Sequence, residues 1–286
     1  MAVIMGTEGP DRLVSPDANV DDTINALGGD DFIEARGGTD LIAPGAGNDH
    51  IEGGDGRDTI LLPGNLDSFQ FFRHDNEGVI RGPEGVDTLL DVEAVRTDAS
   101  GTRDLDSVPE FLGYAYLASY NDLAAAFGAN EGAAWTHFKT YGALEGRDIT
   151  FDGTSYLAAN PDVLGSPEFG ANVNEGAARH YLQYGMAEGR NTDFDGVAYV
   201  ASYGDLIGAF RGAGSEAAID AAGTQHFVQF GFLENRQPDL FNEATYAAAN
   251  PDLAAAGLVT EDQLAMHWIQ FGIDEGRPGA YDPVIA

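Results

Sequence analysis

Six segments of nine residues, each with aspartate in sixth place and an aliphatic residue in eighth, constrain the fold more than any other feature. The aspartates are Asp11, Asp22, Asp31, Asp40, Asp49 and Asp58, and the aliphatic residues are Leu13, Ile24, Ile33, Ile42, Ile51 and Ile60. Only Ser15 and Pro16, inserted after the first segment, interrupt the spacing. One apolar residue per row predicts very short strands, each with a single inward side chain, stacked as a solenoid.

Glycines in the first four places of the rows predict tight loops between these strands, because glycine adopts positive φ angles readily. The glycines expected beside a bound ion are Gly28, Gly29, Gly37, Gly38, Gly45, Gly47, Gly53 and Gly54. Loop carbonyls and one carboxylate per row supply hard oxygens, of which Ca²⁺ takes roughly six to eight. We therefore expect Ca²⁺ as the cofactor. The alternative is a metal-free solenoid held by the aliphatic residues, but one buried residue per row gives it little stability.

These rows resemble the RTX family of haemolysin-type calcium repeats, whose pattern Gly-Gly-x-Gly-x-Asp-x-aliphatic-x builds a parallel β-roll. The resemblance implies two rows per turn, with each ion between loops two rows apart. It would pair Asp11 with Asp31, Asp22 with Asp40, Asp31 with Asp49, and Asp40 with Asp58. The first two rows depart from the pattern, since Asp17, Ala18 and Val20 stand where glycines are usual. After this roll, over residues 1–61, we expect a β-rich cap over 62–103 that closes its open edge.

Residues 104–286 contain a longer repeat of four units, which predicts an all-α array of helical pairs. The units begin near Tyr114, Ser155, Ala198 and Thr245, and each ends in a stretch led by His137, His180, His226 or His267. The expected fold class is thus multidomain β + α, with a roll, a cap and a helical array. The unit resembles a module found in tandem in bacterial surface proteins and beside enzymes of polysaccharide assembly, which implies a carbohydrate-related setting.

The repeated polar residues of the array favour structural roles. We expect each histidine to bond a neighbouring backbone or carboxylate group at a helix contact, and the repeated aspartates and arginines to pair. The glycines Gly142, Gly185, Gly231 and Gly272 are expected as left-handed helix caps, and aromatics three apart, such as Tyr181 and Tyr184, on one face. Tyr120, Trp135, Tyr203 and Trp268 are candidates for stacking on sugar rings, with a core position as the alternative.

We do not expect an enzyme, because no catalytic motif is present and a reaction centre is normally unique rather than copied four times. The net charge of −33 argues against nucleic acid or an anionic membrane as a partner. No run reaches the length of a membrane helix, there is no cysteine, and the N-terminus lacks the features of a cleaved signal peptide. We expect an extracellular or particle-surface location, reached by type I export or by lysis.

The expected function is a non-catalytic calcium-binding surface or attachment protein that recognises cell-envelope polysaccharide or capsule. One alternative is a spike or fibre on a phage-like particle that binds host capsule, and another is a structural surface-layer component. The expected partners are therefore a bacterial polysaccharide, further copies of the chain in a homo-oligomer, or a larger particle.

Overall fold

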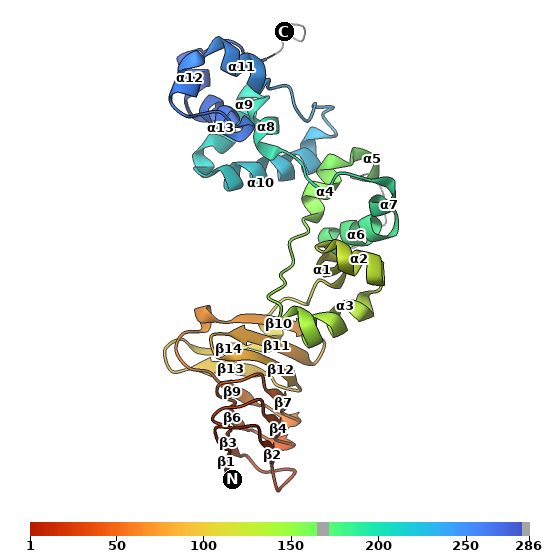
Figure 1. Ribbon diagram of the computed structural model, residues 1–286, viewed down its shortest axis with the longest axis vertical. Coiled ribbons are helices and arrows are strands. Elements are labelled where there is room, and N and C mark those ends of the chain that lie inside the picture. The colour runs from red at the N-terminus through yellow and green to blue at the C-terminus, as the bar shows by residue number, and fades with distance from the viewer. Residues whose placement is uncertain (165–171, 282–286) are drawn as a thin grey trace. The chain divides into compact units, whose positions relative to one another are not determined.

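The computed structural model describes residues 1–164 and 172–281. Its internal contacts divide the chain into two compact units. The first comprises residues 1–116 and 130–149, and the second comprises 117–129 and 150–286. Figure 1 labels the strands of the first unit and the helices of both. Each unit is described by itself.

The first unit starts with a parallel β-roll, in which successive rows contribute strands alternately to two sheets. One sheet takes β1 (Val3–Met5), β3 (Thr23–Asn25), β6 (Leu41–Ala43) and β9 (Thr59–Leu61). The other takes β2 (Arg12–Val14), β4 (Phe32–Glu34) and β7 (His50–Glu52). Two-residue strands, β5 (Gly37–Gly38) and β8 (Asp55–Gly56), pair within the glycine loops. These parallel sheets confirm the N-terminal β-roll.

The core of the roll is a column of aliphatic side chains. Parallel register places Ile24 beside Ile42 and Ile42 beside Ile60, because each row lies on the row two before it. All five isoleucines of the column are fully buried, and Leu13 is nearly so. Each buried isoleucine stabilises the fold by about 1.5–3 kcal/mol. The residues on either side of each point outward, which is why strands of three residues suffice.

The two sheets continue past Leu61. After η1 (Leu66–Ser68), strands β10 (Gln70–His74) and β11 (Glu77–Gly82) form an antiparallel hairpin. Strand β12 (Gly85–Leu90) then pairs parallel to β7, and β13 (Ala94–Thr97) pairs parallel to β9. Strand β14 (Gly101–Asp104) is antiparallel to β13 and is followed by η2 (Leu105–Ser107). The segment expected as a cap therefore contains further strands of the roll as well as the antiparallel strands at its end.

The first unit also includes helical segments from beyond residue 103. These are the start of α1 (Gly113–Ala118), helix α3 (Glu131–His137) and the π-helix η3 (Phe138–Gly142). The ring of Phe138 packs against Phe72 and Phe111, with centroids 4.6 and 4.7 Å apart. Glu77 of the hairpin accepts hydrogen bonds from Trp135 Nε1 and Lys139 Nζ. These contacts group the first helical repeat partly with the sheets, so the compact unit does not end at the expected boundary of residue 103.

All regular secondary structure in the described residues of the second unit is helical, apart from an isolated bridge between Phe241 and Tyr281. Its elements before the third repeat are α2 (Asn121–Phe127), α4 (Gly153–Ala159), α5 (Pro161–Leu164), α6 (Val173–His180), η5 (Tyr181–Gly185) and α7 (Met186–Glu188). The third repeat has α8 (Gly196–Ala201), α9 (Gly204–Phe210), η6 (Arg211–Ala213), α10 (Glu216–His226) and η7 (Phe227–Gly231). The fourth has α11 (Glu243–Ala249), α12 (Pro251–Ala255), α13 (Glu261–His267), η8 (Trp268–Gly272) and α14 (Ile273–Glu275).

In the described residues, each repeat thus has three α-helices before its π-helix, where the sequence suggested a pair, and the second and fourth repeats add a three-residue helix after it. The Asn-Pro-Asp turn divides the first half, because helix α11 ends at Ala249 and α12 begins at Pro251. Proline suits this first position, since it lacks the N–H that a helix start leaves unpaired. The last helix of each repeat runs directly into a π-helical turn, as α10 runs into η7.

The glycine of each π-helix is not the left-handed cap that we expected. Gly185 closes η5 with helical angles, and the left-handed residue is Gly189, four positions later. The glycine is needed for close packing, since a Cβ at Gly231 would lie 2.2 Å from the hydroxyl of Tyr199. The same hydroxyl approach occurs at Gly142, Gly185 and Gly272.

Candidate metal centre

The sixth-place aspartates form a column along each edge of the roll. On one edge, the backbone N–H of Asp31 donates to Oδ1 of Asp49 at 2.8 Å, and that of Asp11 donates to Oδ1 of Asp31 at 2.7 Å. On the other edge, the N–H of Asp22 donates to Oδ1 of Asp40 at 2.6 Å, and that of Asp40 to Oδ1 of Asp58 at 2.9 Å. The carboxylates of Asp31, Asp40, Asp49 and Asp58 therefore each use one oxygen to accept a hydrogen bond from the row two before their own.

The second carboxylate oxygen has no protein partner in four of these rows. Oδ2 of Asp31, Asp40, Asp49 and Asp58 is buried without a hydrogen bond, although these side chains are almost fully enclosed. An unpartnered buried acceptor costs about 1–3 kcal/mol, and more when it is charged. Four such oxygens in adjoining rows indicate that a cation supplies the missing partner.

The first two rows differ, because the protein itself satisfies their second oxygens. Oδ2 of Asp22 accepts a hydrogen bond from Ser15 Oγ at 2.5 Å. Oδ2 of Asp11 accepts from the backbone N–H of Thr7 at 2.6 Å and from its hydroxyl at 2.9 Å. Ser15, inserted after the first row, thus occupies at Asp22 the acceptor that is left unpartnered in the later rows. The inferred pairs with Asp11 and Asp22 have fewer oxygens to offer a metal.

Burial shifts the titration of the inward carboxyls. It raises the pKa of Asp49 to about 6 and that of Asp58 to about 7, with neighbouring acids adding to the effect. Burial also raises the pKa of Asp31 and Asp40. The pKa of Asp22 is lowered, chiefly by its hydrogen bond from Ser15. Ionisation is therefore unfavourable where the second oxygen is unpartnered, and a bound divalent cation would reverse this.

The glycine loops stack closely, so that carbonyl oxygens of one loop lie against glycines of the next loop on the same edge. A Cβ at Gly47 would lie 2.1 Å from the carbonyl oxygen of Gly29, and one at Gly56 would lie 1.6 Å from that of Gly38. Both glycines have positive φ, 140° and 133°, so a side chain is excluded by conformation as well as by space. Only glycine in fourth place allows adjoining loops to stack at this distance.

The second residue of each of rows three to six also has a positive φ, yet in two of these rows that residue is not glycine. Gly45 and Gly54 have φ of 93° and 92°, whereas Leu27 and Arg36 take the same place with φ of 73° and 74°. Non-glycine residues in this region are strained and persist where the surroundings hold them. The repeated stacking of the loops supplies that constraint.

The residues present fit a calcium ion held between rows. Within the described ranges, no three acidic or histidine side chains gather into one metal-binding cluster. Carboxylates instead meet two at a time along each edge, so the remaining oxygens must come from the backbone carbonyls of the loops. A mixture of carboxylates and carbonyls suits Ca²⁺, which accepts many oxygen ligands in flexible geometry.

Two further acids complete the columns, and our reading of the sequence missed both. The N–H of Asp49 donates to Oδ1 of Asp87 at 3.1 Å, and that of Asp58 donates to Oε2 of Glu93 at 2.7 Å. Burial raises the pKa of Asp87 to about 8. The signal was present in residues 82–90, which repeat the spacing with Gly85 in fourth place and Leu89 in eighth. The hairpin inserted before this row, and Pro83 in its second place, concealed it.

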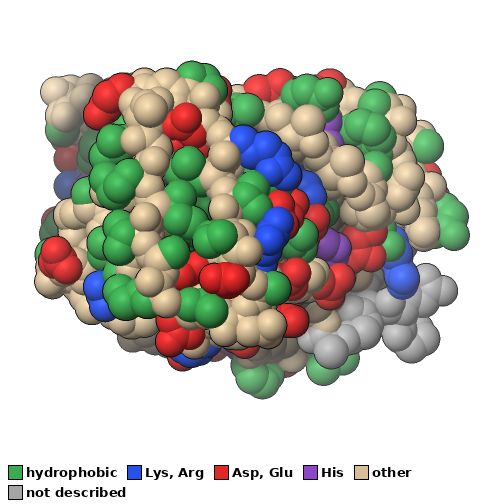
Figure 2. Space-filling model, turned by 90° about the horizontal axis from the view of Figure 1, so that it is seen from below, with side chains coloured by type: hydrophobic (Ala, Val, Ile, Leu, Met, Phe, Trp, Pro, Cys, Tyr) green, Lys and Arg blue, Asp and Glu red, His purple; other side chains and the backbone are tan. Residues whose placement is uncertain are grey.

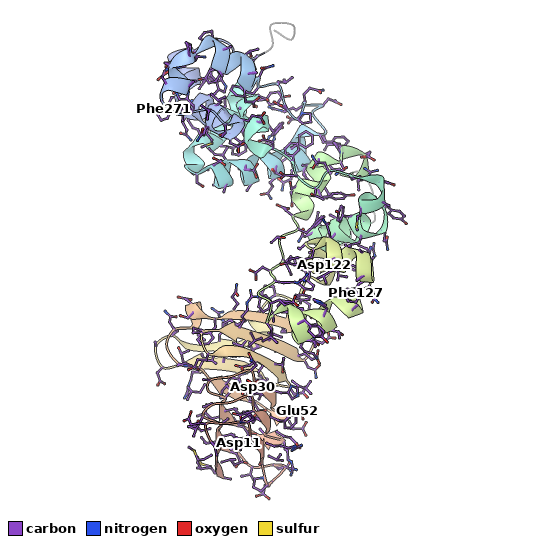
Figure 3. The ribbon with its side chains drawn as sticks, in the orientation of Figure 1. Asp11, Asp30, Glu52, Asp122, Phe127 and Phe271 are labelled. Atoms are coloured by element: carbon purple, nitrogen blue, oxygen red, sulfur yellow. The ribbon has the colours of Figure 1, made fainter. Side chains whose placement is uncertain are left out.

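An outer column of fifth-place residues runs beside the inner one. Asp30 accepts a hydrogen bond from the N–H of Asn48 at 2.8 Å, and Asp21 accepts one from Thr39 at the same distance. Figure 3 labels Asp30, together with Asp11 and Glu52, among the side chains of the roll. These exposed carboxylates add negative charge near the loops, which attracts cations.

The histidines of the helical repeats bond tyrosine rather than the backbone or carboxylate groups that we expected. The hydroxyl of Tyr199 and Nδ1 of His226 are 3.1 Å apart, and those of Tyr246 and His267 are 2.9 Å apart. The pairs Tyr116–His137 and Tyr156–His180 share this bond at 2.9 and 2.8 Å. Each tyrosine is fully buried, so the bond satisfies its hydroxyl inside the repeat.

The repeated charges form ion pairs, as the spacing suggested. Arg190 contacts Asp162 at 2.9 Å, Arg236 contacts Asp205 at 2.8 Å, and Arg277 contacts Asp252 at 2.7 Å. Each arginine also contacts the glutamate two residues before it. These pairs join the start of the second helix to the end of the repeat.

The aromatic residues proposed for sugar stacking lie in various surroundings. Trp135 and Trp268 are buried, and Nε1 of Trp268 donates to the carbonyl of Ala201 at 3.1 Å. Tyr203 is partly buried beneath the guanidinium of Arg236, 4.8 Å from its ring centre. Tyr120 is partly buried next to the start of α2. The burial of both tryptophans agrees with the core position that was the alternative for them.

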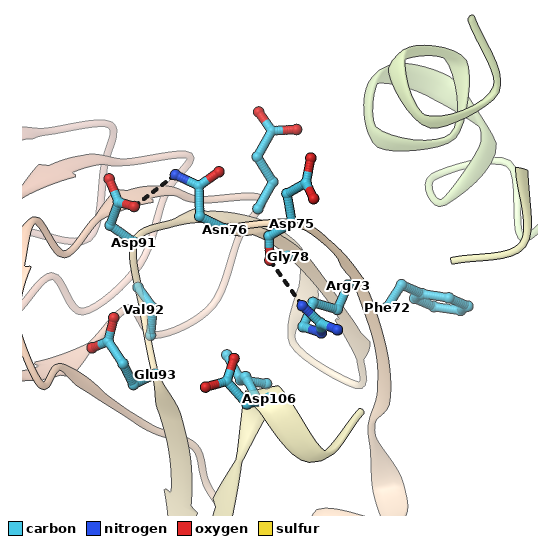
Figure 4. A pocket seen from close by; sticks show the side chains of 11 residues that line it. Phe72, Arg73, Asp75, Asn76, Gly78, Asp91, Val92, Glu93 and Asp106 are labelled. Atoms are coloured by element: carbon cyan, nitrogen blue, oxygen red, sulfur yellow. Dashed lines mark hydrogen bonds between the residues drawn. The ribbon is translucent and has the colours of Figure 1, made fainter. Parts of the chain in front are cut away.

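A pocket of about 450 Å³ lies in the first unit beside the hairpin (Figure 4). Its lining includes Arg73, Asp75, Asn76, Asp91 and Asp106. The arginine is already committed, since Nη1 donates to the carbonyl of Asp75 at 3.1 Å and Nη2 contacts Glu110 at 2.7 Å. The amide of Asn76 donates to Asp91 at 2.7 Å. We therefore interpret the polar groups that line this pocket as stabilising the hairpin.

The surface carries the excess of acids that the composition implies. Figure 2 shows acidic side chains scattered over the face seen from below, among hydrophobic groups and a smaller number of basic ones. No helix in the described part of the chain is long and apolar enough to cross a membrane.

Comparison with known families identifies the repeats of the roll. A family model described as the RTX calcium-binding nonapeptide repeat, in four copies, matches residues 19–51 and 45–61. No curated protein matches the chain. Repeats of this kind bind Ca²⁺ and are typical of extracellular proteins secreted by type I systems. The matched rows contain five of the stacked aspartates, from Asp22 to Asp58, so Ca²⁺ is the cofactor of this region, as the sequence indicated.

Proposed function

We propose that this chain is a non-catalytic attachment protein that works outside the cell or on a particle surface. Calcium orders the roll, and the helical repeats bind cell-envelope polysaccharide. The observation that carries the proposal is the repetition of one surface arrangement: in each repeat, an exposed aromatic side chain lies against a histidine fixed by a buried tyrosine.

Repetition favours attachment over catalysis. A reaction centre needs one set of groups with distinct roles, whereas the polar groups of these repeats recur with the same partners. Repeated weak sites on one chain gain strength against a polymer, because the first contact raises the effective concentration of the next segment. The array is therefore suited to hold a long ligand.

The calcium requirement supports an extracellular setting. The roll buries carboxylates whose second oxygens lack partners, so it is unstable until a divalent cation is bound. Extracellular calcium modules bind with Kd values on the order of 0.1–1 mM. A roll with such affinity would order after export and stay loose inside a cell.

The test is binding of the purified full chain to polysaccharides extracted from bacterial envelopes, in calcium and in excess chelator. We expect saturable binding in calcium from a chain whose β-sheet and helical circular dichroism signals are both present. A folded chain that binds none of these polysaccharides would refute the proposal. Ordered lattices on calcium addition without such binding would indicate the surface-layer alternative instead.

A further inference from the structure

Four aromatic side chains at equivalent positions of the helical repeats are exposed. Tyr141, Tyr184, Phe230 and Phe271 expose 58%, 51%, 52% and 59% of their surface. Each directly precedes the glycine of its π-helix. Single exposed apolar residues are common on protein surfaces and need no explanation. Exposure of a ring at the same place in all four repeats indicates a shared role.

Each exposed ring lies against the histidine of its repeat. The ring centres of His226 and Phe230 are 5.5 Å apart, and those of His267 and Phe271 are 5.8 Å apart. The imidazole cannot turn freely, since its Nδ1 bonds the buried tyrosine hydroxyl. Within the described part of the chain, Nε2 of these two histidines has no hydrogen-bond partner, so it remains available to a ligand.

An ion pair lies near each of these rings. His226 is within electrostatic range of Arg236, Glu234 and Asp205, and His267 has the corresponding neighbours. The carboxylate of Asp205 is about 60% exposed while it holds the arginine, so it keeps free acceptor sites. Burial, with the nearby arginine, lowers the pKa of His226, which keeps its imidazole neutral at pH 7.

These groups have the chemistry that binds a sugar. A flat apolar ring suits the C–H face of a pyranose, and hydroxyls at the rim of the sugar need donors and acceptors nearby. A protein partner would instead favour a continuous apolar patch, whereas each ring here is bordered by charged and imidazole groups. The flanking groups thus point to a polyhydroxylated ligand.

We propose that Tyr184, Phe230 and Phe271, with the histidine and ion pair of each repeat, form equivalent carbohydrate-binding sites in the second unit. This inference rests on the proposed attachment function and assigns its residues. Figure 3 labels Phe271 at the outer edge of the C-terminal helices.

The charge of the sites selects the class of polysaccharide. The sites of Phe230 and Phe271 each combine one arginine with an aspartate and a glutamate, which leaves a net negative charge beside a histidine whose pKa is lowered by burial. The whole chain has a net charge of −33. Acidic polymers would be repelled over a distance of about 8–10 Å at ordinary ionic strength. The preferred ligand is therefore a neutral polysaccharide.

The experiment compares the full chain in saturating calcium with a variant carrying Phe230→Ala and Phe271→Ala. A matched variant carries Phe230→Tyr and Phe271→Tyr, because tyrosine already stands at this place in two repeats. A second control carries Val259→Ala, which removes an apolar group that is 69% exposed and is not part of any proposed site. All these side chains are exposed, so the unfolding temperatures should agree.

We expect affinity for neutral polysaccharides to fall at least tenfold in the double alanine variant and to remain in both controls. Unchanged affinity in the alanine variant would overturn the site assignment while leaving the attachment function intact. Binding of the unaltered chain to acidic polysaccharides alone would overturn the assignment of ligand class. Absence of binding to either class would remove both proposals. Self-association abolished by the alanine changes, with sugar binding intact, would assign the rings to a second copy of the chain.

Discussion

Substituting Asp40 by asparagine should change the stability of the roll in opposite directions with and without calcium. Asparagine retains Oδ1, which accepts the backbone N–H of Asp22 at 2.6 Å. It replaces the unpartnered Oδ2 by an amide nitrogen and removes one buried charge. Without calcium, we expect the free energy of unfolding to rise by about 1 kcal/mol, because a charged group left unpartnered costs more than a neutral one.

With calcium the same substitution should be destabilising. Asp40 adjoins both Asp22 and Asp58 along its edge, so it contributes to a site on each side. A tenfold loss of affinity per site costs about 1.4 kcal/mol, which gives about 3 kcal/mol for two saturated sites. The change of sign between the two conditions distinguishes a metal ligand from a residue with a purely structural role.

The measurement is denaturant unfolding followed by circular dichroism, in saturating calcium and in excess chelator. The matched control is Asp55→Asn, which removes one acid from an exposed third-place position of the same roll. We expect the control to change stability by less than about 0.5 kcal/mol in both conditions. Destabilisation of equal size with and without calcium, or equal effects at the two positions, would show that Asp40 is not a ligand.

Three further outcomes follow from the structure. Burial raises the pKa of Asp87 to about 8, so the folded roll favours the protonated carboxyl. Without calcium, the free energy of unfolding should therefore be highest at acidic pH and should fall as the pH rises from about 4 to 8. Calcium binding near neutral pH should release protons. Thermal unfolding at pH 5 and pH 8 in chelator tests this, and greater stability at pH 8 would contradict it. Gly47→Ala should destabilise the roll by more than about 2 kcal/mol, whereas Gly9→Ala, with open space around it, should have little effect on the melting temperature. In the helical array, Gly231→Ala should destabilise the fold because the added methyl group would clash with the hydroxyl of Tyr199. Gly208→Ala in helix α9 should be neutral or stabilising by up to about 1 kcal/mol. Equal melting temperatures for the two variants would refute the packing role of Gly231.

The roll was predictable because its spacing alone specifies its geometry. An aliphatic residue two positions after each aspartate leaves one strand register that buries the column, and Ile24, Ile33 and Ile42 occupy it as expected. Asp87 and Glu93 were not found, since an inserted hairpin removed the continuity on which the search depended. Asp87 lies next to Asp49 only because β12 pairs with β7 in the sheet. Local spacing in the sequence does not encode this long-range pairing.

The sequence predicted that the repeats are helical, but it did not predict which of their aromatic side chains are exposed. Aromatics three apart share a face on an α-helix, yet Phe227 is buried and Phe230 is exposed. The π-helical turn, with its i to i+5 hydrogen bonds, changes the angle between them. The role of the adjoining glycine depends on a tyrosine hydroxyl from another helix, which sequence spacing does not reveal. The four sugar-stacking candidates chosen from the sequence accordingly did not include the exposed rings, and two of them, Trp135 and Trp268, are buried.

The hydrogen bonds that the aspartates accept from the rows two before their own give the roll a direction. A backbone N–H near the N-terminal end is satisfied only when a later row is already in place, as Asp22 depends on Asp40 and Asp40 on Asp58. The last N–H in this edge is held by Glu93, beside the antiparallel strands that close the roll. We therefore expect the rows next to the hairpin to become ordered first and the rows near Met1 to become ordered last. Hydrogen exchange during calcium addition should show protection appearing first in β9 and last in β1. The N-terminal rows should therefore fold last on calcium addition and unfold first on its removal.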